Sequence, residues 1–402
     1  MDPQSLTAED VAERAGVDAA FLNELQDAGV IAADERGRFT SGAVRRAQLV
    51  RACAEAGLSV DAIGTALAKG TLTLAPLDAP HYERWGAKAD VTYGQLAVRL
   101  GVPFEFLRAT QEALGFQAPA AGDRPRQDEI DTMPVLAVAV AHGIDQDALL
   151  RLFRVYGDSL RRIASAETGL WHEQVDVPLQ RGGMSQREVL EAGEGFGEAV
   201  MPLIDQAMLS MYRRMQETAW MADLVEHVQI ALEEAGVHER LERPPAMVFA
   251  DISGYTRLTE EHGDEAAADL ATAMADLVQG TAVRNRGQAV KFLGDGVMFH
   301  FREAADGLLA ALDVVAGTAG AGLPPAHVGL HAGPVVIRDG DCFGRTVNWA
   351  ARISSQAQAD EVLVTREVIE AAAGVEVTFD PIGPVDLKGI AAPVELFRAS
   401  RA

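Results

Sequence analysis

The sequence predicts a chain of the α+β class, with an all-α N-terminal part followed by a mixed C-terminal domain. Three observations support this prediction. Before Pro244, apolar residues recur at helical spacing and no segment alternates like a strand. From Ala246 onward, short apolar runs such as AMVFADI alternate with helical patterns. The length of 402 residues also exceeds one typical domain, so two or three domains are expected.

The first segment, LTAEDVAERAGVDAAFLNELQDAGVI, predicts two short helices separated by a turn at Gly16. This is the pattern of a helix-turn-helix unit, and RGRFTSGAV after it fits a small wing. The segment VTYGQLAVRLGVPFEFLRATQEALGF repeats the first at an offset of 85 positions, pairing Thr7 with Thr92 and Gly16 with Gly101. We therefore expect two helix-turn-helix units in tandem.

A long helix is expected to close the N-terminal part, from about Glu198 towards Glu234, after an irregular segment TGLWHEQVDVPLQRGGM. The paired prolines of HERLERPP are expected to end this helix. Its methionines are interpreted as helix core; the alternative is an adaptable apolar site for a fatty acid or a partner helix. These methionines are Met201, Met208, Met211, Met215 and Met221.

The composition argues against several classes of partner. A formal net charge of −24 repels nucleic acid phosphates and anionic membranes, and residues 1–80 alone carry a net charge of −5. No nucleic acid is therefore expected as a partner, despite the helix-turn-helix pattern. Cys53 and Cys342 lie far apart and are expected to be reduced thiols. The polar start MDPQSLTAED is no signal peptide and no apolar run is long enough to span a bilayer, so a cytoplasmic protein is expected.

Two carboxylates stand out in the C-terminal domain. Asp251 follows the AMVFADI run, and Asp295 occupies a Gly-Asp-Gly turn between two predicted strands. Each alone reads most simply as a turn or cap residue. Together they are able to hold a divalent cation, because Mg²⁺ accepts one or two carboxylates plus substrate phosphates. The segment ISGYT next to Asp251 starts a helix whose N–H groups would face an anion, so this combination suggests phosphoryl transfer.

The segments FADISGYTRL, VKFLGDGVMF, VGLHAG and DCFGRTVNWAAR resemble, in order and spacing, the signatures of the class III adenylate and guanylate cyclases. The resemblance implies a ferredoxin-like βαββαβ catalytic domain at residues 244–402. The first helix-turn-helix, residues 1–75, is similar to that of MerR proteins. Residues 76–243 would then form a helical regulatory domain with a long linker helix.

The resemblance also implies a set of site residues. Asp251 and Asp295 would bind two metal ions, Mg²⁺ or Mn²⁺. Lys291 and Asp341 would read the adenine edge, and Asn348 would orient the ribose. The remaining residues would act on phosphates: Arg352 on the charge that develops on the transferred phosphoryl group, Lys388 on the terminal phosphates, and Thr256 as part of the substrate-binding set.

Base choice follows from hydrogen-bond polarity. Adenine offers an acceptor at N1 and a donor at N6, which a lysine and an aspartate complement. The family's guanylate cyclases have an acidic residue in place of Lys291, so ATP is expected to be preferred to GTP. Lys291 and Asp295 lie on one strand-turn element but act at opposite ends of the nucleotide. The family resolves this with a head-to-tail homodimer that shares its active sites.

Two features depart from the commonest family pattern. His327 stands where an arginine that helps to bind phosphates is common, and histidine carries a charge only in the acidic part of the physiological pH range. The segment from Gly333 to Asp341 is short for a dimerisation arm, which resembles a short-arm subclass.

The whole layout is similar to autoinhibited mycobacterial adenylate cyclases that respond to acid pH. We therefore expect the N-terminal part to restrain the enzyme, with pH or a lipid as the signal; His227 and His238 are either switch residues or solvated surface residues. Two other interpretations of the chain remain: a ligand-sensing protein with a degenerate cyclase domain, and a transcription regulator.

Overall fold

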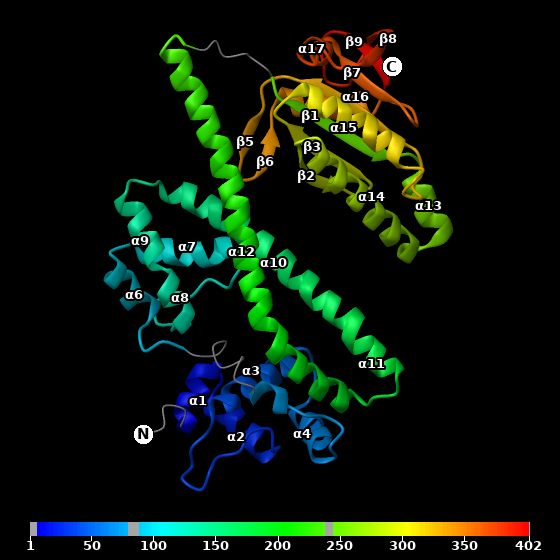
Figure 1. Ribbon diagram of the computed structural model, residues 1–402. Coiled ribbons are helices and arrows are strands. Elements are labelled where there is room, and N and C mark those ends of the chain that lie inside the picture. The colour runs from blue at the N-terminus through cyan, green and yellow to red at the C-terminus, as the bar shows by residue number, and fades with distance from the viewer. Residues whose placement is uncertain (1–5, 79–87, 238–243, 402) are drawn as a thin grey trace. The chain divides into compact units, whose positions relative to one another are not determined.

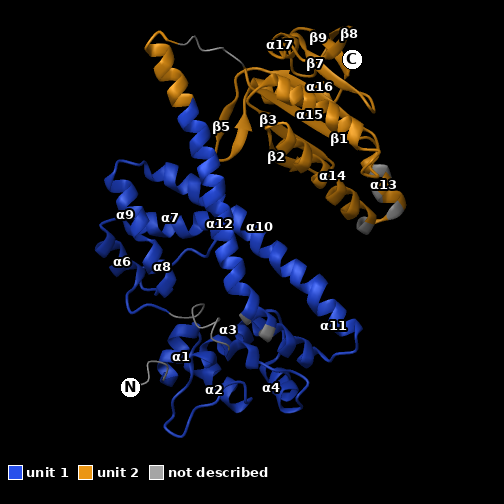
Figure 2. Cartoon of the chain, viewed as in Figure 1, with its two compact units in different colours: residues 1–225 blue, residues 226–402 orange. Residues whose placement is uncertain are grey.

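The computed structural model describes residues 6–78, 88–237 and 244–401 (Figure 1). The chain forms two compact units, residues 1–225 and 226–402 (Figure 2). None of the helices in the described part of the chain has both the length and the apolar character needed to cross a bilayer.

The first unit is helical, as predicted, and its described residues contain only two isolated β-bridges, Leu6–Phe39 and Lys88–Arg126. Its helices are α1 (Ala8–Ala15), α2 (Ala19–Asp27), α3 (Ser41–Glu55), α4 (Val60–Ala68), the 3₁₀ helix Ala75–Asp78, α6 (Tyr93–Leu100), α7 (Phe104–Leu114), α8 (Gln127–Thr132), α9 (Pro134–Ala141), α10 (Gln146–Trp171), the π-helical turn His172–Asp176, α11 (Val177–Arg181) and most of α12 (Gln186–Glu234).

The tandem repeat is confirmed by the caps of its helices. Thr7 forms a capping box at the start of α1, and Thr92 forms the equivalent capping box at the start of α6. Gly16 and Gly101 end these helices in the left-handed conformation, with φ of 69° and 68°. Glycine adopts this conformation without a Cβ clash, so the two glycines create the same turn in both units.

The expectation of an irregular segment TGLWHEQVDVPLQRGGM is wrong. Helix α10 runs to Trp171, and a π-helical turn leads directly into α11. The wider π turn precedes Pro178, whose ring would clash with the carbonyl four residues back in a regular helix. Helix α12 also starts at Gln186, earlier than expected. Phe196 near its start packs edge-on against Trp171, with ring centroids 4.8 Å apart. This tertiary contact joins α12 to α10.

The paired prolines do not end α12. The helix ends at Glu234, and Gly236 follows with φ of 67° while its N–H donates to the carbonyl of Glu233. A glycine C-cap therefore terminates the helix well before the prolines.

The interpretation of the methionines as helix core is also wrong for the single chain, because three of them are exposed on α12: Met211, Met215 and Met221. The expected wing does not form a hairpin, as Phe39 makes only the isolated bridge.

The second unit contains a seven-stranded sheet in the order β2-β3-β1-β4-β7-β9-β8. Its strands are β1 (Ala246–Ile252), β2 (Gln288–Leu293), β3 (Gly296–Phe301), β4 (Ala326–Ala332), β7 (Val362–Thr365), β8 (Val377–Val385) and β9 (Val394–Arg401). The first four strands with their intervening helices give the expected βαββαβ arrangement, and β1 lies between β3 and β4 with antiparallel pairing to both.

Helices cover both faces of this sheet (Figure 1). The helices are α13 (Tyr255–His262), α14 (Asp264–Arg284), α15 (Ala304–Gly317), α16 (Arg345–Ser354) and α17 (Arg366–Ala371). Alternate residues of β1 point to opposite sides: Val248 packs in the main core with α14 and α15, and Met247 packs with Ala350 of α16. The central strand β1 is thus buried on both faces, and α16 packs on the face opposite to α14 and α15.

Two elements refine the prediction. The segment expected to be one helix after Asp251 is divided into α13 and α14 at Gly263, which has φ of 85°. The short arm is a two-stranded hairpin of β5 (Val336–Arg338) and β6 (Asp341–Phe343). Its apolar side chains Val336, Ile337 and Phe343 are exposed in the single chain.

Candidate active site

Asp251 and Asp295 are brought together by the pairing of β1 with β3. Asp251 lies opposite Gly296 in this pairing, and Asp295 lies in the turn that joins β2 to β3. Gly294 makes the turn with φ of 70°. At Gly296, a Cβ atom would lie only 3.3 Å from a carboxylate oxygen of Asp251. The two glycines therefore allow the carboxylates to approach each other.

The electrostatics of this pair favour a cation. Burial raises the pKa of Asp251 above its usual range, and the negative charge of Asp295 raises it further. His327 of β4 has the opposite effect, with Nε2 3.8 Å from Asp251 and Nδ1 3.3 Å from the Ser253 hydroxyl. The partly desolvated, repelling carboxylates fit a divalent cation, which would neutralise them. Among the described residues no group of three or more metal-binding side chains occurs, so phosphates or water would complete the coordination.

Lys291 and Asp341, the predicted base-reading pair, are also brought together. Lys291 on β2 donates to the Asp341 carboxylate on β6 over 3.0 Å. The other carboxylate oxygen of Asp341 accepts a hydrogen bond from the backbone N–H of Cys342 at 2.9 Å. The aspartate is thus oriented by its own strand, whereas the lysine, about half exposed, is free to turn towards a ligand.

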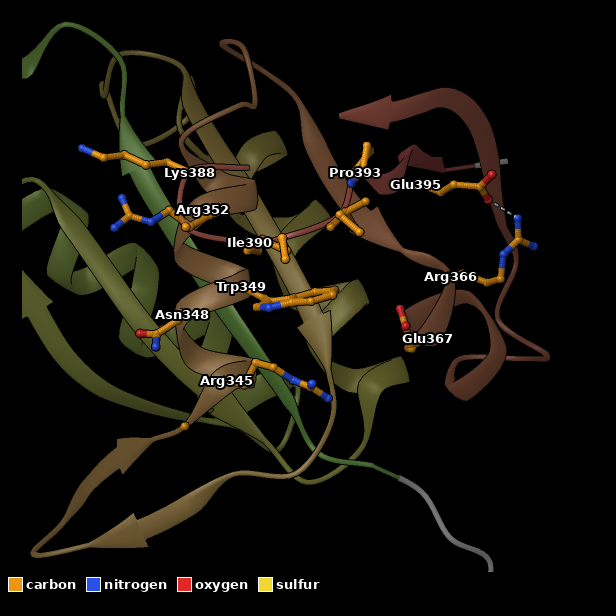
Figure 3. A pocket seen from close by; sticks show the side chains of 15 residues that line it. Arg345, Asn348, Trp349, Arg352, Arg366, Glu367, Lys388, Ile390, Pro393 and Glu395 are labelled. Carbon is orange, nitrogen blue, oxygen red and sulfur yellow. Dashed lines mark hydrogen bonds and ion pairs between the residues drawn. The ribbon is translucent and has the colours of Figure 1, made fainter. Parts of the chain in front are cut away.

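A third group of predicted residues lines a pocket of about 1030 Å³ beside α16 (Figure 3). Asn348 and Arg352 project from one side of the helix, and Lys388, on the segment before β9, points in the same direction beside Arg352. Trp349 and Ile390 also line the pocket, and the Trp349 ring points away from these polar groups. The pocket thus combines amide and cationic groups suited to a ribose and to phosphates.

The single chain does not gather all predicted residues in one place. Among the described residues that line the α16 pocket, neither Asp251 nor Asp295 is present. Thr256 lies in α13, and its side chain falls outside the described part of the structure. The predicted residues therefore form three groups: the carboxylate pair, the base-reading pair and the α16 pocket.

The sequence interpretation overlooked His331 and Trp349. The ring of His331, buried on β4, stacks on that of Trp349 with centroids 4.8 Å apart and an interplanar angle of 27°. The guanidinium of Arg345 lies 5.7 Å from the same Trp349 ring. Both residues lie inside the family motifs VGLHAG and DCFGRTVNWAAR, next to the polar residues that the resemblance assigns to the site.

Two family models match this chain. Residues 239–398 match the model of the adenylate and guanylate cyclase catalytic domain, and residues 39–217 match that of an adenylate cyclase regulatory domain. The chain is 30% identical over 281 residues to an adenylate cyclase of Streptomyces coelicolor, covering 69% of this chain and 71% of the relative. It is 28% identical over 331 residues to a pH-sensitive adenylate cyclase of Mycobacterium tuberculosis, covering 77% and 78%.

Among solved structures, an adenylyl cyclase of P. aeruginosa shares 24% identity and a TM-score of 0.35, covering 39% of this chain and 94% of that chain. The sequence relatives and the family models show that the chain belongs to the adenylate and guanylate cyclase family. It joins an adenylate cyclase regulatory domain to a cyclase catalytic domain, as the sequence resemblance implies.

Proposed function

We propose that the protein is an adenylate cyclase that converts ATP to 3′,5′-cyclic AMP and pyrophosphate. The observation that carries the choice of ATP is the contact of Lys291 with Asp341, which sets a donor beside an acceptor at 3.0 Å. Adenine presents the complementary acceptor N1 and donor N6. A guanine edge would face the lysine with a donor, and the mismatch would leave polar groups unpaired.

In the reaction the ribose 3′-oxygen bonds to the α-phosphorus, the bond from this phosphorus to the pyrophosphate breaks, and the 3′-hydroxyl proton passes to solvent. Asn348 orients the ribose for this attack, and Arg352 donates to the oxygens on which charge develops. Asp251 and Asp295 would hold two divalent ions, Mg²⁺ or Mn²⁺, which polarise the 3′-hydroxyl and neutralise the triphosphate. Lys388 and Thr256 complete the contacts to the nucleotide.

We place the active site between two copies of the chain. The pocket residues Asn348 and Arg352 lie on α16, and the described lining of that pocket contains neither metal carboxylate. A head-to-tail homodimer would join the carboxylates of one subunit to the base-reading pair and pocket of its partner. Two equivalent sites follow from the two-fold symmetry.

We further propose that the N-terminal part restrains the enzyme. Three separate hydrophobic cores support boundaries near residues 75 and 243, giving segments 1–75, 76–243 and 244–402. The 49-residue helix α12 passes from the first unit into the second. We do not extend the proposal to a fatty acid, because three of the five methionines that suggested one are exposed in the single chain. The widely separated free cysteines support a cytoplasmic location.

The direct test is to incubate the purified protein with ATP and Mg²⁺ or Mn²⁺ and to measure cyclic AMP and pyrophosphate, with GTP in parallel. Equal amounts of both products from ATP, with much less from GTP, are expected. Asp251→Ala and Asp295→Ala serve as controls and should abolish the reaction without loss of the fold. Absence of cyclic AMP, or near-normal production by either variant, would contradict the proposal.

A further inference from the structure

We propose that His331 is a positioning residue for the cyclase reaction, which sets helix α16 and thereby aims Asn348 and Arg352 through its stack on Trp349. This inference rests on the proposed roles of Asn348 and Arg352. His331 itself lines no part of the described α16 pocket and would not touch the nucleotide. It lies beneath the helix, on β4.

The stack joins the sheet to the helix that carries Asn348 and Arg352. The His331 and Trp349 rings lie nearly parallel, at 27°, with centroids 4.8 Å apart. Trp349 lies on the same helix as Asn348 and Arg352 but points away from them, so the helix backbone fixes the three side chains relative to one another (Figure 3). A rotation of α16 that separated the two rings would therefore turn the amide and the guanidinium away from their present directions.

His331 is well suited to be the fixed side of this contact. Its side chain is buried, and Nδ1 lies 2.9 Å from the hydroxyl of Thr365, the last residue of β7. Because β4 and β7 are paired strands of the sheet, the imidazole is held by the rigid part of the domain. Burial lowers the pKa of His331, and Arg345 lowers it further, whereas Glu367, 3.9 Å away, raises it. A neutral ring is thus favoured beneath Trp349.

Other contacts also hold α16 on the sheet, including its middle, where a Cβ at Gly329 of β4 would lie 2.7 Å from the carbonyl oxygen of Ala350. Near the C-terminal end, a Cβ at Gly329 would lie 2.0 Å from the backbone nitrogen of Ser354, so here strand and helix touch backbone to backbone. At the N-terminal end, the Thr346 hydroxyl donates to the carbonyl of Pro334 at 2.7 Å. These close contacts set the distance between helix and strand, while the ring stack resists rotation of the helix about its axis.

Such a role should act on the reaction more than on substrate binding. A misplacement of reacting groups by about 1 Å costs on the order of a hundredfold in rate. Since Arg352 would act chiefly on charge that develops in the transition state, loss of its alignment lowers kcat and leaves KM nearly unchanged.

The test uses the full-length protein with ATP and Mg²⁺. His331→Leu removes the planar ring and should lower kcat by roughly tenfold or more, with KM changed by less than about threefold. The matched variant His331→Phe keeps an aromatic ring for the stack but not the Thr365 contact, and it should keep kcat within about threefold of the wild type. Trp349→Leu should resemble His331→Leu, and thermal unfolding of each variant reports whether the fold is kept.

A double variant, His331→Leu with Trp349→Leu, should have no lower kcat than the poorer single variant, because both changes remove the same contact. Multiplicative losses in the double variant would overturn the inference, as would full activity in His331→Leu or an equal loss in His331→Phe. If His331→Leu does not fold, His331→Gln replaces it in the test, because Trp349 itself lines the pocket and its substitution also changes the pocket wall. Asn348→Ala and Arg352→Ala distinguish failure of this inference from failure of the proposed function. A normal kcat in these two variants would contradict the proposed function itself.

Discussion

The ammonium of Lys291 lies 3.0 Å from the carboxylate of Asp341, so the two side chains proposed to read the base are paired with each other. Their side chains are 52% and 29% exposed. An ion pair this accessible to water contributes at most about 1 kcal/mol to stability. Little free energy is therefore needed to open the pair and redirect both groups to a nucleotide, which makes it possible to alter them without loss of the fold.

The first prediction concerns base selectivity. Lys291→Glu combined with Asp341→Cys should lower kcat/KM for ATP and raise the GTP-to-ATP ratio of kcat/KM by at least about tenfold, because the guanine edge has reversed polarity. The single variant Lys291→Glu is the control, since it sets two carboxylates side by side and should be poor with both nucleotides. An unchanged ratio in a folded double variant would mean that the base is read elsewhere.

The second prediction concerns Asp251, whose pKa is raised by burial and by Asp295. A carboxyl whose pKa is higher in the folded state than in the unfolded state stabilises the fold below the unfolded pKa and loses this contribution as pH rises. At neutral pH the ionised group thus destabilises the metal-free protein. Asp251→Asn should raise the Tm in EDTA at pH 7.5 while abolishing cyclic AMP formation, and the gain should shrink as pH falls towards 4.

The matched control for this measurement is Asp269→Asn, which neutralises an exposed carboxylate on α14. Calorimetry of the three proteins should show a gain only for Asp251→Asn. A Tm equal to or below that of the wild type would show that the Asp251 carboxylate is not held in an unfavourable site.

The third prediction tests the shared active site. Asp251→Ala and Asn348→Ala should each be inactive alone, yet their mixture should regain activity. A heterodimer has one site with both defects and one site with none, so random pairing restores up to about a quarter of wild-type activity. Cyclic AMP formation is measured after subunit exchange, with heterodimers verified by two affinity tags. An inactive mixture that contains heterodimers would refute shared sites.

The fourth prediction concerns acid. Burial lowers the pKa of both His331 and His300, with Arg302 contributing at His300. Because these folded-state pKa values lie below the unfolded value of about 6.5, the stability is present above that pH and is lost as pH falls towards the lower folded-state values. The Tm should therefore fall on going from pH 7 to pH 5. His331→Phe keeps a ring but cannot be protonated, so its Tm should fall less; identical slopes would contradict the prediction.

The sequence predicted features that depend on local signals and missed those that depend on contacts between distant residues. The Thr7 and Thr92 caps are visible because a capping box and a C-terminal glycine lie within a few residues of each other. The start of α12 was misjudged because the contact of Phe196 with Trp171 is tertiary. The residues proposed to bind the metal ions and the base were identified through their motifs. The stack of His331 on Trp349 was not, since strand and helix meet only in the folded sheet.

The last prediction concerns restraint by the N-terminal part. Helix α12 is continuous across the boundary between the units, which falls between Val225 and Glu226, so it is able to couple them as a two-state element. At pH 8, a truncated protein that starts near residue 241 should therefore be at least about fivefold more active than the full chain. A factor of about five is the lower end of common allosteric coupling. Cyclic AMP formation by both proteins is compared from pH 5 to 8.

If histidine protonation releases the restraint, the advantage of the truncated protein should disappear towards pH 5. His227 lies in α12, and His238 lies outside the described residues. Replacing both with glutamine in the full chain should then keep the restraint at every pH. A truncation effect that does not vary with pH would retain the restraint and exclude the histidines as its switch. A truncated protein no more active than the full chain at any pH would refute the restraint altogether.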